Sequence, residues 1–239
     1  MMASDWEKDL RQQIGEAIIR YSDFVRLYLS SFRIGNRPDE LRRLLRGRKR
    51  TALILNADDY KPDEVRASSL RRELDELKSN GLDPVEVDLR EYFTKPDELV
   101  LALSSVDLIY VRGGKVFILR RAFKQSGADQ LIKELLATDA VVYAGYSAGG
   151  CVLGPTLRGI SGDIDDPDFI PDGYEPGPPI WDGLGVLPYV IAPHYKSDPF
   201  VTPEVDRCIE YFIAHHIPFI ALRDGEAIVV DDGRETVVS

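Results

Sequence analysis

A serine at the end of an apolar run is the first residue of this sequence whose surroundings indicate catalysis. Residues 140–144 are apolar, the sequence Gly-Tyr-Ser-Ala-Gly follows at residues 145–149, and helix-compatible residues resume at once. This order of strand, sharp turn and helix is what a nucleophile elbow requires, so we predict that Ser147 is the nucleophile of an acyl-transfer reaction. The flanking glycines would let strand and helix approach closely. The alternative is a glycine-rich turn that contains a serine by chance.

A general base has to come from a short list, because the chain contains only three histidines. His215 and His216 end a helical pattern over residues 204–214, where imidazoles interact favourably with the helix terminus. His194 instead follows the apolar run 189–192 and a proline, which places it at the carboxyl end of a strand. We predict that His194 is the base, with a purely structural histidine as the alternative.

The third member of a triad should be a carboxylate that orients the imidazole, and two chain orders compete for it. If the acid precedes the histidine, the aspartates between residues 163 and 172, Asp163 and Asp166 among them, are candidates. If it follows, Asp224 stands at the end of the strand predicted over residues 217–222, with Glu226 as its neighbour. The residues alone leave both orders open.

An oxyanion site needs backbone N–H groups beside the nucleophile. The predicted strand 107–111 ends at Arg112, Gly113 and Gly114, and paired glycines can turn an amide toward a substrate oxygen. We assign the two donors to Gly114 and to Ala148, the residue after the nucleophile. A strand-to-helix turn without a ligand is the alternative for this glycine pair.

An acidic substrate side chain would need a cation within reach, because an unpaired carboxylate is costly to remove from water. Four cationic side chains flank the predicted site in the sequence and are the substrate-binding candidates: Arg112, Lys115, Arg158 and Lys196. The alternative for each is a solvated surface charge.

Composition excludes several classes of function. The 239 residues are 44% hydrophobic and 29% charged, with a formal net charge of −10, whereas binding to nucleic acid or an anionic membrane needs a basic face. Cys151 and Cys208 are too few for a disulfide framework and lack the spacing of a zinc site. We therefore expect no metal or organic cofactor. The charged N-terminus does not resemble a signal peptide, so we expect a cytoplasmic protein.

Alternating strand and helix patterns predict the fold. Apolar strands are expected over residues 25–30, 51–56, 85–89 and 107–111, with helices starting at Pro38, spanning residues 64–80 and starting near Thr94. This alternation predicts an α/β fold: a doubly wound, mostly parallel sheet with helices on both faces and the elbow at a strand end. Ligands bind at the carboxyl ends of strands in such sheets, where all the candidate residues lie.

The N-terminal segment has a helical pattern of its own. Apolar residues recur at spacings of three and four and predict an amphipathic helix over about residues 5 to 23: Trp6, Leu10, Ile14, Ala17, Ile18 and Tyr21. We therefore expect an N-terminal helical extension over residues 1–24 and a single α/β domain over residues 25–239. Whether that helix packs on its own domain or on a second subunit stays open, as does the choice between monomer and homodimer.

Four ordered motifs together resemble the aspartyl dipeptidase and cyanophycinase family of serine peptidases, whose fold is similar to that of class I glutamine amidotransferases. They are Arg-Gly-Gly-Lys-Val-Phe at residues 112–117, Gly-Tyr-Ser-Ala-Gly at 145–149, Pro-His-Tyr at 193–195 and Leu-Arg-Asp-Gly at 222–225. The resemblance covers about residues 25 to 232. It implies the order serine, histidine and acid, hence Ser147, His194 and Asp224, with Gly114 and Ala148 at the oxyanion positions.

The sequence departs from the family at identifiable positions. Members commonly carry a third glycine where Arg112 stands, asparagine and threonine where Lys115 and Val116 stand, and often glutamate at position 224. The resemblance implies a serine peptidase acting on small peptides, including dipeptides with an N-terminal Asp, through an acyl-enzyme. An esterase or other acyl hydrolase of the same fold, or a non-catalytic binding or assembly protein, are the alternatives.

Overall fold

The computed structural model describes residues 25–160, 164–197 and 201–239. The predicted N-terminal helix and Asp163 lie outside the described residues. Within the described parts of the chain, no helix combines the length and apolar character needed to cross a bilayer.

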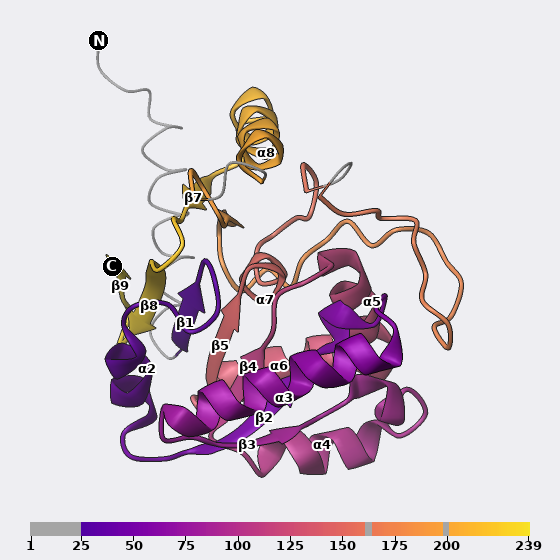
Figure 1. Ribbon diagram of the computed structural model, residues 1–239, viewed down its shortest axis with the longest axis vertical. Helices are drawn as coiled ribbons and strands as arrows, with labels where there is room; N and C mark the ends of the chain where they lie inside the picture. Colours follow the sequence, from indigo (N-terminus) through magenta and orange to yellow (C-terminus); the bar gives the residue numbers. More distant parts are fainter. Residues whose placement is uncertain (1–24, 161–163, 198–200) are drawn as a thin grey trace, which may run out of the picture.

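A seven-stranded sheet forms the centre of the fold (Figure 1), with the strand order β3-β2-β4-β5-β1-β8-β9. The first five strands in that order are parallel, and β8 and β9 extend the sheet antiparallel at one edge. Their bounds are β1 Arg26–Ser30, β2 Arg50–Ile54, β3 Asp83–Glu86, β4 Leu108–Val111, β5 Val142–Tyr146, β8 Ala227–Asp231 and β9 Arg234–Val238. The mostly parallel sheet predicted from the sequence is confirmed.

Helices cover both faces of this sheet. The bounds are α2 Pro38–Leu45, α3 Asp63–Ser79, α4 Pro96–Ser104, α5 Val116–Ser126 and α6 Ala128–Ala137. Side chains alternate between the faces along each strand, so Leu27 and Leu29 pack in one apolar cluster with α4, α5 and α6. Tyr28, between them in sequence, packs in the opposite cluster with α2 and α3.

A second, two-stranded parallel sheet pairs β6 (Val190–Ala192) with β7 (Phe219–Ala221). The connection between these strands contains α8 (Thr202–Ala214), and β7 and α8 lie together at the upper end of the view in Figure 1. The strands before His194 and Asp224 were predicted correctly, but they form this small sheet beside the main one.

The structure differs from the sequence prediction in three local features. The strand expected over residues 85–89 begins and ends earlier, as β3 (Asp83–Glu86), and a 3-10 turn, η2 (Leu89–Tyr92), follows it. Helix α4 begins after Lys95, which makes no side-chain cap, although a capped start was expected at Thr94. Strand β9 was not predicted, because its sequence alternates without a strong apolar face and its pairing partner β8 is what orders it.

Candidate active site

Ser147 lies on a sharp turn between β5 and the short helix α7 (Ala148–Cys151). Its backbone has φ 49° and ψ −117°, a conformation that costs energy for a residue with a side chain and is typical of a nucleophile elbow. A Cβ atom on Gly145 would lie 2.7 Å from the Gly149 carbonyl oxygen, and one on Gly149 would lie 2.3 Å from that of Val111. The expected close approach of strand and helix is therefore confirmed.

The structure brings together the three side chains that the family order implies. His194 Nε2 lies 3.1 Å from Ser147 Oγ, and His194 Nδ1 lies 2.8 Å from Asp224 Oδ1. With the proton on Nδ1, the imidazole donates to the carboxylate and accepts from the serine hydroxyl. This arrangement can deprotonate a nucleophilic serine and stabilise the resulting imidazolium.

Parallel pairing of β6 with β7 explains why His194 and Asp224 meet. Ala192 pairs with Ala221, so the residues that follow both strands leave the small sheet at the same edge. The next backbone bonds continue this alignment, because Leu222 donates to the Ala192 carbonyl and Tyr195 donates to the Leu222 carbonyl. The histidine and the carboxylate therefore project from adjacent backbone segments.

Ser31, which follows β1, holds both residues and was missed in the sequence. Its hydroxyl lies 2.8 Å from Asp224 Oδ1, and it accepts a 2.7 Å hydrogen bond from the backbone N–H of His194. Ser197 adds a further restraint, since its Oγ accepts from the backbone N–H of Asp224. No local pattern marks Ser31, because its partners lie more than 160 residues away in the chain.

The other candidate carboxylates have different partners. Glu226 accepts from the backbone N–H of Arg223 at 2.7 Å, within its own turn. Asp166 likewise accepts from the backbone N–H of Asp168. Asp224 is therefore the carboxylate that the structure places on the imidazole of His194.

The proposed oxyanion donors lie beside the nucleophile. Gly114 and Ala148 both line a cavity that contains Ser147 and His194. Among the residues that the structure describes, no acceptor lies on the backbone N–H groups of Gly114 and Ala148. A Cβ atom at position 114, where φ is 149°, would lie 2.5 Å from the Ala57 carbonyl oxygen, so this turn requires glycine.

Two cavities flank Ser147. One, of about 60 Å³, is lined mainly by apolar side chains from β6 and α8, among them Ile191, Val205 and Phe212. The other, of about 250 Å³, is more open and is lined by the aromatic side chains of Phe32, Tyr60 and Tyr146, together with Asp58, Lys61 and Arg112. A peptide bound across Ser147 would therefore meet an apolar surface on one side and a charged one on the other.

The four predicted substrate-binding cations occupy different places. Arg112 lines the charged cleft, but its guanidinium is engaged with Glu73, Asp58 and the Gly113 carbonyl. Lys115 Nζ donates to the Ile164 carbonyl. Like Lys115, the remaining two line neither of these cavities: Arg158 stacks over Trp181 in a separate groove, and Lys196 lies over the ring of Tyr195.

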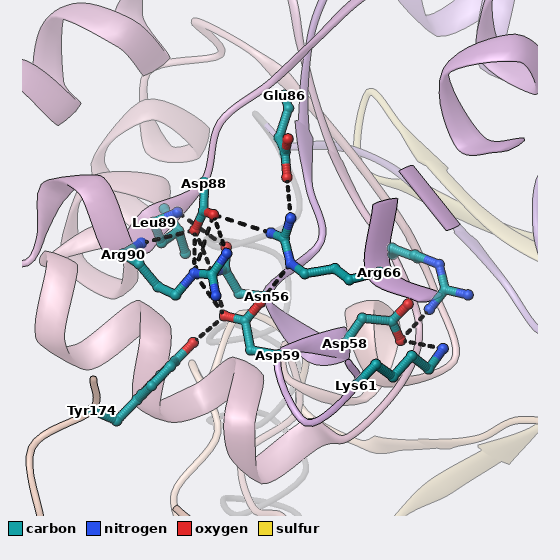
Figure 2. Close-up of polar contacts among 11 residues, drawn as sticks. Asn56, Asp58, Asp59, Lys61, Arg66, Glu86, Asp88, Leu89, Arg90 and Tyr174 are labelled. Carbon is teal, nitrogen blue, oxygen red and sulfur yellow. Dashed lines mark hydrogen bonds and ion pairs between the residues drawn. The ribbon is translucent and has the colours of Figure 1, made fainter. Parts of the chain in front are cut away.

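Sequence reasoning missed a polar cluster that fixes the segment after β2. Figure 2 shows Asp59 at its centre, with Arg66, Asn56 and Tyr174 all donating to its carboxylate. Arg66 also bridges to Glu86 and Asp88. Because Asp59 and Arg66 are buried, the cluster holds the backbone of the 3-10 turn η1 (Asn56–Asp58) against the body of the protein.

Lys61 is a cation in the charged cleft that was also missed. Its ammonium lies 2.8 Å from Asp58 Oδ1, and Figure 2 shows the pair beside the Asp59 cluster. Lys61 and Lys115 approach the Tyr60 ring, at 5.4 and 6.0 Å from its centroid. Charged side chains of both signs, Asp58 and Lys61, thus line the same cleft as Ser147.

Asp165 lines the apolar cavity together with its neighbour Ile164. Its Oδ2 accepts from the backbone N–H groups of Val116 and Phe117 at the start of α5. The residue is 2% exposed, and burial raises the pKa of the carboxyl group to about 6, although these hydrogen bonds and Lys115 oppose the shift.

This pKa predicts a pH dependence of stability. An unfolded aspartate has a pKa of about 3.9, so the folded protein binds the proton of the Asp165 carboxyl group more tightly than the unfolded chain does. The stabilisation that this proton provides is complete below about pH 4 and is lost as pH rises through about 6. Two pKa units correspond to about 3 kcal/mol. Asp165→Asn removes this titration, so the free energy of unfolding of the wild type, relative to the variant, should fall by about 2 kcal/mol between pH 4 and pH 7.

Urea denaturation of both proteins across that range measures the difference. Curves that remain parallel from pH 4 to pH 7 would contradict the raised pKa.

The described residues contain no group of three or more His, Cys, Asp or Glu side chains arranged to hold a metal ion. Cys151 and Cys208 are both buried free thiols, and burial raises the pKa of each.

Comparison with known proteins identifies the family of the chain. The model of the family described as Peptidase family S51 matches residues 40–238. The chain is 32% identical over 156 residues to "Uncharacterized peptidase Lin0382" of Listeria innocua, covering 65% of this chain and 69% of that protein. It is 29% identical over 161 residues to "Probable alpha-aspartyl dipeptidase" of Drosophila melanogaster, covering 63% and 60%.

A solved structure shares the fold. The crystal structure of a peptidase from an acI-B1 Actinobacterium superposes with a TM-score of 0.66 at 18% identity, covering 90% of this chain and 88% of that one. Since the family model extends over most of the sequence, from residue 40 to residue 238, the chain belongs to peptidase family S51.

Proposed function

We propose that this protein is a serine peptidase that hydrolyses short peptides, including dipeptides with an N-terminal Asp, through an acyl-enzyme. The observation that carries the proposal is the continuous contact from Ser147 Oγ through the His194 imidazole to Asp224 Oδ1. The family assignment and the relative named as a probable alpha-aspartyl dipeptidase support the same chemistry.

The geometry supports a two-step mechanism. Ser147 Oγ attacks the scissile carbonyl carbon while His194 Nε2 takes its proton, and the N–H groups of Gly114 and Ala148 stabilise the oxyanion. The C–N bond then breaks as His194 returns the proton to the leaving amine. Water attacks the acyl-enzyme with His194 again as base, which releases the carboxylic acid and restores the serine.

A hydrolysis screen over dipeptides and short peptides tests the proposal, with release of free amine as the signal. Ser147→Ala, purified in the same way, is the control for contaminating peptidases. Turnover by the wild type and none by the variant supports the proposal. Turnover of aryl esters without turnover of any peptide would indicate the esterase alternative instead.

Preference for an acidic N-terminal residue is a separate prediction. A desolvated carboxylate needs a nearby cation, and Lys61 and Lys115 lie beside the exposed Tyr60 ring at the charged cleft. We expect Asp-X dipeptides to have a kcat/KM about tenfold or more above that of matched Leu-X dipeptides, a difference of about 1.4 kcal/mol. Steady-state kinetics at several ionic strengths measures it.

Lys61→Met should remove this preference and leave the Leu-X rate within threefold of wild type. The opposite order, with Leu-X cleaved faster by the wild type, would mean that the apolar cavity beside α8 receives the acyl side chain.

A further inference from the structure

A buried ion-pair network lies beside the Gly113–Gly114 turn. Arg112 Nε donates to Glu73 Oε1 over 3.1 Å, and Arg112 Nη1 donates to Asp58 Oδ1 over 2.5 Å. Glu73, Asp58 and Arg112 are 1%, 0% and 8% exposed. Removing three charged groups from water is costly even when they are paired, so stability alone is a poor explanation for this network.

The same arginine also binds its own turn. Arg112 Nη1 donates to the Gly113 carbonyl oxygen over 2.7 Å. That carbonyl and the N–H of Gly114 belong to one planar trans peptide, so they point in opposite directions. Holding the carbonyl toward the guanidinium therefore directs the Gly114 N–H away from the network, and Gly114 lines both cavities that contain Ser147.

Glu73 connects this turn to the elbow. The Tyr146 hydroxyl, one residue before the nucleophile, donates to Glu73 Oε1 over 2.8 Å, the same oxygen that accepts from Arg112. The two segments are in close contact, because a Cβ atom on Gly113 would lie 2.8 Å from Tyr146 Cε2 and 2.9 Å from Ser147 Cβ. One carboxylate oxygen thus links Arg112, which precedes the Gly113–Gly114 turn, to Tyr146, which precedes the nucleophile.

The network itself is firmly anchored. Asp58 belongs to η1, which the Asp59 cluster of Figure 2 holds in place, and it pairs with Lys61 as well as with Arg112. The backbone N–H of Lys115 donates to the Ala57 carbonyl, which ties the glycine turn to the same segment. The guanidinium therefore has a fixed position from which to orient the turn.

We infer that Arg112 is a positioning residue that fixes and polarises the Gly113–Gly114 peptide as an oxyanion donor. The inference rests on the peptidase function proposed above. A cationic donor on the carbonyl strengthens the N–H of the same peptide as a hydrogen-bond donor, because hydrogen bonds in a chain polarise one another. Arg112 thus restrains the neighbouring Gly113–Gly114 peptide through its own side chain.

The test compares Arg112→Met with Arg120→Met, using the best peptide substrate of the wild type. Arg120 is a matched control, since it is also 8% exposed, pairs with Asp129 and donates to a backbone carbonyl, that of Asp182. Loss of an oxyanion donor lowers kcat by about 10²–10³, so misorienting one should lower it about 10- to 100-fold with KM within threefold. Arg120→Met should keep both constants within threefold of wild type.

A second pair of variants covers the case in which Arg112→Met does not fold because two buried carboxylates lose their partner. The double variant Glu73→Gln/Arg112→Met removes one charge of each sign and leaves the Asp58–Lys61 pair in place. The amide oxygen at position 73 remains an acceptor for the Tyr146 hydroxyl. Measured against Glu73→Gln alone, the double variant should show the same 10- to 100-fold loss of kcat.

Three outcomes would overturn the inference. An unchanged kcat in both Arg112 variants excludes a role in positioning the donor. A higher KM with kcat retained, specific to acidic substrates, would make Arg112 a substrate-binding residue. A crystal structure of the variant with the Gly114 N–H direction unchanged would exclude orientation by the guanidinium. This last readout decides the inference even if the wild type hydrolyses no peptide, a result that would contradict the proposed function alone.

Discussion

Ser147→Ala should abolish peptide hydrolysis while leaving the protein folded. The side chain supplies the attacking oxygen, and loss of a triad serine lowers kcat by a factor on the order of 10⁶. Alanine removes one oxygen from a residue whose Oγ contacts His194, and it leaves the elbow backbone and its two close-packed glycines in place. Single-turnover and steady-state assays of the purified variant measure the loss.

Ser126→Ala is a suitable comparison for this variant. Ser126 is buried outside the site, where its hydroxyl donates to the Ala122 carbonyl within α5. That variant should retain wild-type kcat within threefold. Circular dichroism and thermal unfolding should show both proteins folded, and a Ser147→Ala protein that keeps activity within tenfold of wild type would remove the proposed nucleophile.

Asp224→Asn should lower kcat by about 10⁴, the second-largest effect expected, because an amide favours the wrong tautomer of the histidine. The structure gives the physical reason: Asp224 Oδ1 lies 2.8 Å from His194 Nδ1 and 2.8 Å from Ser31 Oγ. An amide nitrogen facing Nδ1 could donate to it, which would move the imidazole proton to Nε2 and block acceptance from Ser147. Kinetics of the folded variant test this expectation.

Glu226→Gln is the matched control, since this neighbouring carboxylate accepts from the backbone of its own turn at Arg223. It should stay within tenfold of wild type. A nearly wild-type Asp224→Asn together with an inactive Glu226→Gln or Asp166→Asn would contradict the choice of acid. Ser147 and His194 would then need a different third partner.

The elements that carry the site were readable from sequence because each depends on local patterns. The apolar run before Ser147, the adjacent glycines and the small number of histidines lie in short stretches, and the strands before His194 and Asp224 have strong apolar runs. Parallel strands present their carboxyl ends on one edge, so motifs at several strand ends were expected to converge.

The contacts that could not be predicted join residues far apart in the chain. Arg112 was expected to face a substrate, but Glu73 and Asp58, which precede it by 39 and 54 residues, engage its guanidinium. A buried glutamate in the middle of α3 has no distinguishing local pattern among the many charged residues of that helix. The placement of Ser31 likewise follows from tertiary contacts alone.

Covalent labelling is the most direct test of the claim that Ser147 is an activated nucleophile. A fluorophosphonate reacts with a serine whose hydroxyl is deprotonated by a neighbouring base, and intact-mass and peptide-mapping measurements locate the adduct. We predict one adduct per chain on Ser147 within residues 145–149, no adduct on Ser147→Ala, and slow labelling of Asp224→Asn. An unlabelled wild type, or equal labelling of the Ser147→Ala variant, would contradict the account.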